Sequence, residues 1–334
     1  MAARETGATG KNVPHAYEQG RGRDADTPNQ IPLKGLKDVF WRIVAEIIDD
    51  RVMLIAAGVT YYLLLALFPA LAALVSLYGF VADPVTIAGH IDFLSGLLPP
   101  GSLDIILTQL DALAQQKTSS LSIAFVVGLV VALWSTNSGI KALFEAMNVA
   151  NGEAEKRSLV RLNLMSLAFT LGALLIAVVL ITAIGVVPAV LSYLWLDRWE
   201  EQLARFARWP VILASAGAGI TLLYHYGPSR EHAKFHWLSW GAVFSTLLWL
   251  GASMLFSYYL ENFANYNATY GTLGALIGFM VWMWISTIIV IVGAMLNAEL
   301  EHQTAHDSTT GEPRPMGERG AYVADTLGKT SDED

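Results

Sequence analysis

The chain contains no cysteine in its 334 residues. This absence excludes disulfide bonds, thiolate nucleophiles and cysteine-ligated metal sites, and it leaves the redox compartment open. Charged residues are also scarce, at 15% of the sequence, and the longest stretch without any runs from Asn262 to Ala298. A helix rises about 1.5 Å per residue and the hydrocarbon core of a bilayer is about 30 Å thick, so about 20 apolar residues suffice to cross a membrane.

Six uncharged stretches reach that length, and hydrophobic residues make up 54% of the chain. Backbone amides in lipid must pair within their own segment or close a barrel, and continuous apolar runs favour helices over alternating strands. Buried helices of a soluble core are the alternative, but so many runs and a mean hydropathy of +0.45 oppose it. We predict an all-α polytopic membrane protein whose six transmembrane helices lie in Val52–Ala82, Thr118–Ile140, Leu162–Leu196, Trp209–Ser229, Phe235–Leu260 and Asn262–Ala298.

The basic residues predict the orientation of these helices. Loops rich in Lys and Arg stay in the cytoplasm. All but four of the 21 basic residues lie before Val52, after the second or fourth predicted helix, or in the tail, so both termini are predicted to be cytoplasmic. The net charge of −8 comes largely from acidic residues of the tail, so it indicates that the tail is soluble and does not point to a binding partner. The sequence has no basic face suited to nucleic acid. The four exceptions are Lys117, Arg198, Arg205 and Arg208.

Three regions are predicted along the chain. Residues 1–30 and 303–334 are poor in apolar side chains and are expected to be disordered cytoplasmic ends, whereas residues 31–302 form the six-helix transmembrane domain. No secretory signal precedes the first helix, which is expected to act as its own insertion signal. Two segments that do not span have apolar residues at helical spacing, around residues 36–48 and 103–114, and both are predicted to be amphipathic interfacial helices.

Several sequence motifs carry a family resemblance. They are AAGVTYYLLLALFPALAALVSLYGF in the first predicted helix, LWSTNSGIKALFEAMNVANGEAEKRS around the end of the second, NYNATYG before the last and NAELE after it. Together they resemble the YihY/virulence factor BrkB family of bacterial inner-membrane proteins, over Leu36 to His302. The resemblance implies six membrane helices and cytoplasmic termini but no settled activity. Members have carried the label ribonuclease BN, which is regarded as a misassignment.

The chemistry of the sequence also argues against an enzyme. Phosphodiester cleavage needs clustered carboxylates or histidines, or an acid and a base facing the phosphate, and the acidic residues here are scattered. His232 with His236 and His302 with His306 have i, i+4 spacing but lack the Glu of a metalloprotease helix. The Ser-x-x-Lys pattern from Ser138 lacks its partner motifs. No catalytic residue, metal site or cofactor is predicted.

Uncharged polar residues within or beside the predicted spans are the candidate ligand-binding groups. They would line a polar cavity or groove, whereas the alternative is ordinary packing and anchoring at the interface. Pro69 and Pro188 are predicted kinks, because each removes a backbone hydrogen bond. Gly274 and Gly278 allow close helix packing, within the chain or between protomers of a homo-oligomer. The candidate binding residues are Tyr61, Tyr62, Asn137, His225, Asn267, Thr269 and Tyr270.

The function predicted from these features is transport or handling of a lipid or another amphipathic molecule of the bacterial envelope. It rests on the absence of a soluble domain, on uncharged polar groups within the spans and on amphipathic helices at both faces. The absence of carboxylates inside the membrane argues against a proton pump or a sodium site built on carboxylates. Membrane lipids are the expected partners, and nucleic acid is not. A non-catalytic role in envelope integrity or assembly is the alternative, and a membrane ribonuclease ranks third.

Overall fold

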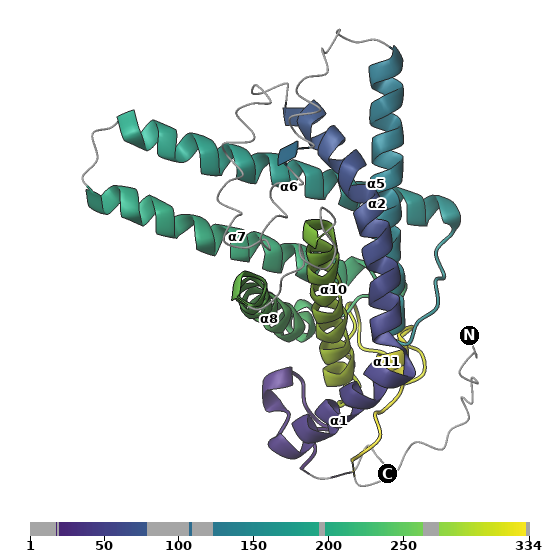
Figure 1. Cartoon of the computed structure of the whole chain (residues 1–334). Coiled ribbons are helices and arrows are strands. Elements are labelled where there is room, and N and C mark those ends of the chain that lie inside the picture. Colours follow the sequence, from purple (N-terminus) through teal and green to yellow (C-terminus); the bar gives the residue numbers. More distant parts are fainter. Residues whose placement is uncertain are drawn as a thin grey trace.

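The computed structural model describes residues 18, 20–78, 107–108, 123–193, 198–262 and 274–331. Within these residues the chain is helical, and β pairing is limited to an isolated bridge between Ala233 and Thr309. Figure 1 shows α2, α5 and α10 side by side and the paired helices α6 and α7 leaving the bundle together. The long helices are α2 (Val52–Tyr78), α5 (Ile123–Ala150), α6 (Leu159–Tyr193), α7 (Arg198–Tyr226), α8 (Phe235–Asn262) and α10 (Gly274–Glu301).

Each long helix coincides with one predicted span, but the bounds differ. Helices α2 and α8 begin at the predicted residues, Val52 and Phe235. Helix α5 continues past the predicted end at Ile140, and α7 begins at Arg198, well before Trp209. The absence of charge identifies the part of a helix suited to lipid, whereas intrahelical hydrogen bonds continue into water. The predicted amphipathic segment at 103–114 lies almost wholly outside the described residues.

Some of these helices meet the requirements of a membrane span by length and composition. Among the described residues, Leu159–Val179, Phe235–Leu260 and Gly274–Glu301 do so. Helix α1 (Leu33–Asp49) and the first part of α2 would qualify together, as a pair bent by 63°. The bend falls at Arg51, whose φ of 53° lies in the left-handed region that ends a helix. These apolar helices agree with a multi-pass membrane protein.

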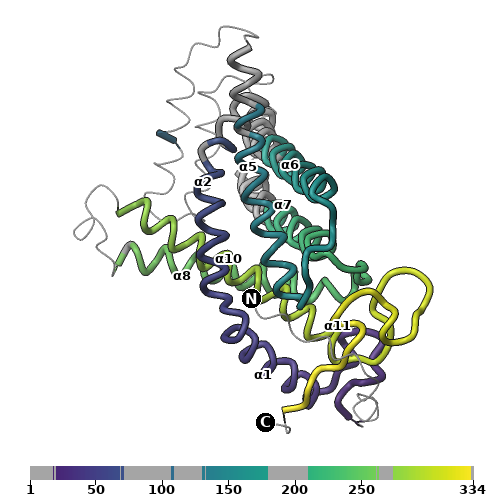
Figure 2. The backbone as a smooth tube through the Cα atoms, turned by 90° about the vertical axis from the view of Figure 1, so that its right-hand side faces the viewer, coloured from purple at the N-terminus to yellow at the C-terminus, as the bar shows by residue number. Residues whose placement is uncertain are grey.

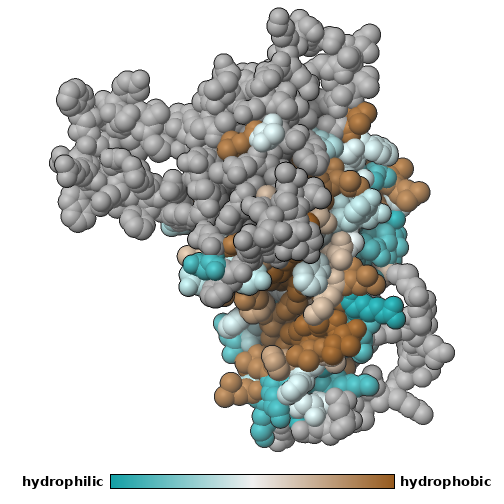
Figure 3. Space-filling view, in the orientation of Figure 1, coloured by the Kyte–Doolittle hydropathy of each residue, from teal (hydrophilic) through white to brown (hydrophobic). Residues whose placement is uncertain are grey.

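Helix α1 is amphipathic as predicted, but its polar face also contacts protein. Val39 and Ile43 are buried, while Phe40 and Trp41 are exposed. Asp38 is fully buried and pairs with Arg21 at 2.7 Å. Periodicity locates the two faces of a helix, but it does not show which of them a neighbouring segment will cover. Figure 3 shows apolar side chains gathered on one face of the molecule above a hydrophilic lower edge.

The core lies where α2, α5, α8 and α10 meet. Small buried residues come from all four helices, namely Ala56, Ala146, Ala242 and Ala294. Small side chains let helix backbones approach closely, which is how helices gain contact energy in lipid. The predicted kink Pro69 lies within α2, and α6 continues through the position of Pro188.

The described parts of the two ends are folded, which corrects the prediction of disorder for residues 1–30 and 303–334. The buried guanidinium of Arg23 donates to the carbonyl oxygen of Gly328 at 2.7 Å, and Thr304 donates to the carbonyl oxygen of Ala25 at 2.6 Å. Composition predicted disorder because these segments have little apolar surface, yet their polar groups are paired with one another. Figure 1 and Figure 2 both show the described parts of the two ends beside α1. Together with residues 151–158 and 227–234, these segments form what we call the charged end.

Candidate functional site

Two buried ion pairs hold the charged end around the last turn of α10. Arg230 Nη2 lies 2.6 Å from Glu301 Oε2, and the two side chains are 3% and 0% exposed. Ser308 Oγ donates to the same carboxylate at 2.7 Å. Arg42 of α1 pairs with Glu299, and His302 Nδ1 lies 3.3 Å from Glu299 Oε1. The NAELE motif therefore joins α1, the loop after α7 and the C-terminal segment.

A third ion pair orders the loop between α5 and α6. Arg157 Nη2 lies 2.6 Å from Glu155 Oε2, and the same nitrogen donates to the carbonyl oxygen of Gly227 at 2.8 Å. Arg157 thereby ties this loop to the end of α7. Partial burial raises the pKa of Glu155, but hydrogen bonds from Arg157 and Asn148 outweigh it and lower the pKa from 4.5 to about 2.

The low pKa of Glu155 predicts a pH dependence of stability. Because the folded state favours the ionised carboxylate, the contribution of Glu155 is complete above its unfolded pKa of 4.5 and is lost as pH falls toward about 2. We expect Glu155→Gln to lower the thermal midpoint at pH 6 and to match the wild type increasingly as the pH is lowered through 4. Thermal unfolding in detergent at several pH values measures this, and a midpoint difference that does not shrink on acidification would contradict it.

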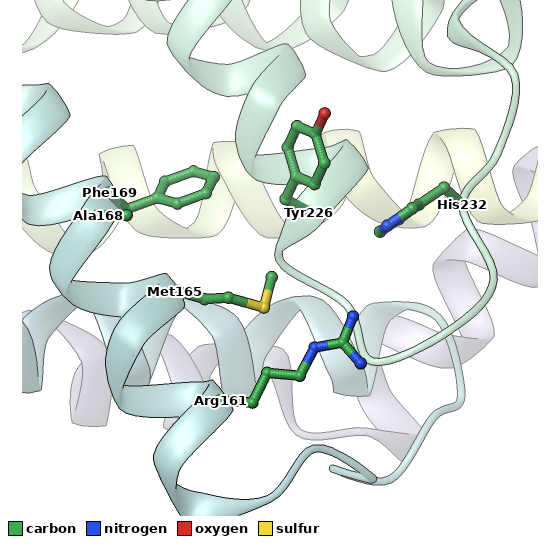
Figure 4. Close-up of a pocket in the computed structure, with 6 residues that line it drawn as sticks. All are labelled: Arg161, Met165, Ala168, Phe169, Tyr226 and His232. Carbon is green, nitrogen blue, oxygen red and sulfur yellow. The ribbon is translucent and has the colours of Figure 1, made fainter.

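An open pocket of about 410 Å³ lies between α6 and the end of α7. Arg161, Met165, Ala168 and Phe169 line it from one face of α6, where they recur at helical spacing. Tyr226, the last residue of α7, and His232, in the loop that follows, also line the pocket. Figure 4 shows side chains from both sides extending toward the opening. The pocket combines basic and aromatic groups with an apolar wall.

The aromatic rings that line the pocket belong to a connected row. The centroid of the Phe169 ring lies 6.4 Å from that of Tyr226, which lies 5.2 Å from that of His232. His225 stacks on His232 at 4.7 Å and on Phe235 at 4.4 Å. His232 Nδ1 lies 2.8 Å from the carbonyl oxygen of His225, so Nδ1 carries the hydrogen that it donates. These contacts fix the position of the His232 ring.

The described members of the predicted binding set lie on three different helices. Tyr61 and Tyr62 of α2 are exposed and meet edge to face at 5.6 Å. Asn137 of α5 is buried, and its Oδ1 has no hydrogen-bond partner among the described residues. His225 of α7 is buried behind the pocket. Within the described parts of the chain no hydrogen bond joins these groups, and Asn267, Thr269 and Tyr270 lie outside them.

The predicted small residues of the last helix are buried in the structure. Gly274 and Gly278 are both buried in α10. A Cβ at Gly278 would lie 3.5 Å from Leu260 Cδ1 of α8, an ordinary contact, so this position packs against a helix of the same chain.

A ladder of hydrogen bonds between α8 and α10 was not predicted from the sequence. Four residues of α8 spaced by four, and therefore on one face, each bond to α10. The spacing of Gly and Ser along α8 is the signal that could have indicated it. The pairs are Gly241 N with Asn297 Oδ1 at 2.7 Å, Ser245 Oγ with the Ile289 oxygen at 3.2 Å, Trp249 Nε1 with Ser286 Oγ at 3.0 Å, and Ser253 Oγ with Trp282 Nε1 at 3.0 Å.

The fold and the pocket define a helical membrane protein with a charged end and a mixed basic and apolar pocket beside it. A profile of the Virulence factor BrkB family matches residues 43–317, and the chain belongs to this family. The match includes the NAELE motif, the pocket and part of the C-terminal segment that was predicted to be disordered.

Individual relatives agree with this assignment. The ribonuclease-like protein YfkH of Bacillus subtilis is 28% identical over 249 residues, which cover 73% of this chain and 88% of YfkH. A UPF0761 membrane protein of Idiomarina loihiensis is 28% identical, and one of Azoarcus sp. is 26% identical. This chain spans 62% and 63% of those two proteins, respectively. No solved structure matches the chain.

Proposed function

We propose that this protein is a bacterial inner-membrane protein with six spans and cytoplasmic termini that binds and moves a lipid or another amphipathic envelope molecule without covalent chemistry. The charged end is then its cytoplasmic end. Six long helices coincide with the six uncharged runs, and the basic residues gather at the charged end, which supports this orientation. The names of the UPF0761 relatives agree with a membrane location.

The pocket between α6 and α7 carries the proposal. Its volume of about 410 Å³ lies within the range of small-molecule sites, which are mostly apolar with a few polar groups. Met165, Ala168 and Phe169 suit an apolar portion of a ligand, and Arg161 and His232 suit a polar head. Helix α6, which lines the pocket, also carries Leu164 and Leu175, whose side chains are each 63% exposed. An amphipathic molecule could therefore enter sideways from the bilayer.

Native mass spectrometry of gently purified protein tests this function. We expect the wild type to retain an amphipathic molecule and Ala168→Trp to lose it, because the indole fills the pocket from its own wall. Ala173→Trp is the matched control, since Ala173 is also exposed on α6 but does not line the pocket. Equal retention by both variants, or a wild type free of any bound amphiphile, would remove this site and favour a non-catalytic assembly role.

A further inference from the structure

We propose that the ligand of the α6 and α7 pocket is an anionic phospholipid, with its phosphate group held by Arg161. This inference rests on the proposed function and names the chemical class of the molecule handled there. The guanidinium of arginine presents a planar set of donors that matches two oxygens of a phosphate, and it keeps its charge at any physiological pH.

The pairing of the neighbouring arginines singles out Arg161. Arg157 forms an ion pair with Glu155 and donates hydrogen bonds to backbone carbonyls, and Arg230 forms an ion pair with Glu301. The guanidinium of Arg161 has no hydrogen-bond or ion-pair partner within the described part of the chain. Each of the six residues that line the pocket lacks a carboxylate. A positive charge with no internal counter-ion beside an apolar wall is complementary to an anionic head with an apolar tail.

The position of Arg161 along α6 fits the headgroup region of a bilayer. Helix α6 begins at Leu159, and the uncharged run suited to hydrocarbon begins at Leu162, directly after Arg161. A cation at this level lies among lipid phosphates, where anionic lipids attract it. The exposed leucines further along α6, Leu164, Leu171 and Leu175, then offer the acyl chains an apolar surface.

His232 supplies a second polar group opposite Arg161. Because its Nδ1 donates to the carbonyl oxygen of His225, its Nε2 is the nitrogen left for a ligand. The C-terminal segment holds this loop in place, since Thr310 N donates to the carbonyl oxygen of His232 at 2.8 Å. The two basic groups thus come from separate segments that the fold holds apart, across the pocket in Figure 4.

The test uses full-length protein in nanodiscs that contain equal amounts of phosphatidylglycerol and phosphatidylcholine, followed by native mass spectrometry of the released protein. We expect the wild type to retain phosphatidylglycerol over phosphatidylcholine, and Arg161→Gln to reduce that ratio about tenfold, which corresponds to about 1.4 kcal/mol. Arg161→Lys should keep part of the preference, because it keeps the charge but loses the planar donors. Lys156→Gln is the charge-matched control, since Lys156 is 60% exposed and pairs with Glu153 outside the pocket.

Three other outcomes would overturn the inference. If Ala168→Trp loses its lipid but Arg161→Gln keeps the wild-type ratio of phosphatidylglycerol to phosphatidylcholine, the pocket binds an amphiphile without selecting for its charge. The proposed function then survives. If Ala168→Trp also retains lipid as the wild type does, the proposed function fails with it. If millimolar inorganic phosphate alone displaces phosphatidylglycerol from the wild type, the site takes a free phosphate and the assignment to a lipid is wrong.

Discussion

Replacing Glu301 by Gln should destabilise the protein by about 3–5 kcal/mol, the cost of removing one partner from a buried ion pair. The neutral amide leaves Arg230, whose side chain is only 3% exposed, without its counter-ion. It also weakens the hydrogen bond that Ser308 of the C-terminal segment donates to this side chain. Thermal or denaturant unfolding in detergent measures the loss. The matched control is Glu318→Gln, which removes a carboxylate from an exposed position of the same segment.

A double substitution separates the burial of charge from the shape of the site. Changing Arg230 to Met together with Glu301 to Leu removes both charges, and replacing a buried ion pair with apolar groups is often neutral or stabilising. We therefore expect the double variant to recover most of the stability lost by Glu301→Gln. If Glu301→Gln unfolds at the same temperature as Glu318→Gln, the ion pair does not hold the charged end together.

The positions of the helices could be predicted because they depend on a property of continuous sequence. An uncharged run that is long enough to cross the bilayer has few stable alternatives to a helix. Accordingly, α8 begins at the predicted residue, Phe235. The end of α5 and the start of α7 were missed because a helix can extend beyond its lipid-facing part in either direction. Local sequence therefore locates the lipid-facing part of a helix more reliably than the residues at which the helix begins and ends.

The site depended on contacts between distant segments, which local sequence does not show. Arg161 and Ala168 lie on one face of α6, so their spacing could have indicated half of the pocket. The other half, Tyr226 and His232, lies far along the chain. Contacts such as the ring pair of Phe169 and Tyr226 and the hydrogen bond from Arg157 to the carbonyl oxygen of Tyr226 bring the two halves together. Likewise, Arg230 and Glu301 are separated by 71 positions, and nothing in the intervening pattern pairs them. The polar ends were mispredicted because their hydrogen-bond partners also lie far along the chain.

The second large effect is expected at the crossing of α8 and α10. A Cβ at Gly241 would overlap the carbonyl oxygen of Gly293 and lie 2.5 Å from both polar atoms of the Asn297 amide. A backbone oxygen of a packed helix cannot move aside alone, so Gly241→Ala must separate the two helices. We expect a loss of about 1–3 kcal/mol or more, the range found when groups are forced into a packed core.

Gly251 provides the control for this substitution within the same helix. A Cβ at Gly251 would meet no atom within 4 Å, so Gly251→Ala gives α8 the same methyl group and the same gain in helix propensity without the overlap. Unfolding in SDS, followed by tryptophan fluorescence, compares the two variants, since Trp249 and Trp282 take part in the ladder. Stability of Gly241→Ala equal to that of Gly251→Ala would contradict a close crossing. A selective loss would show that α8 and α10 form a tightly packed pair, beside which α6 and α7 present the pocket.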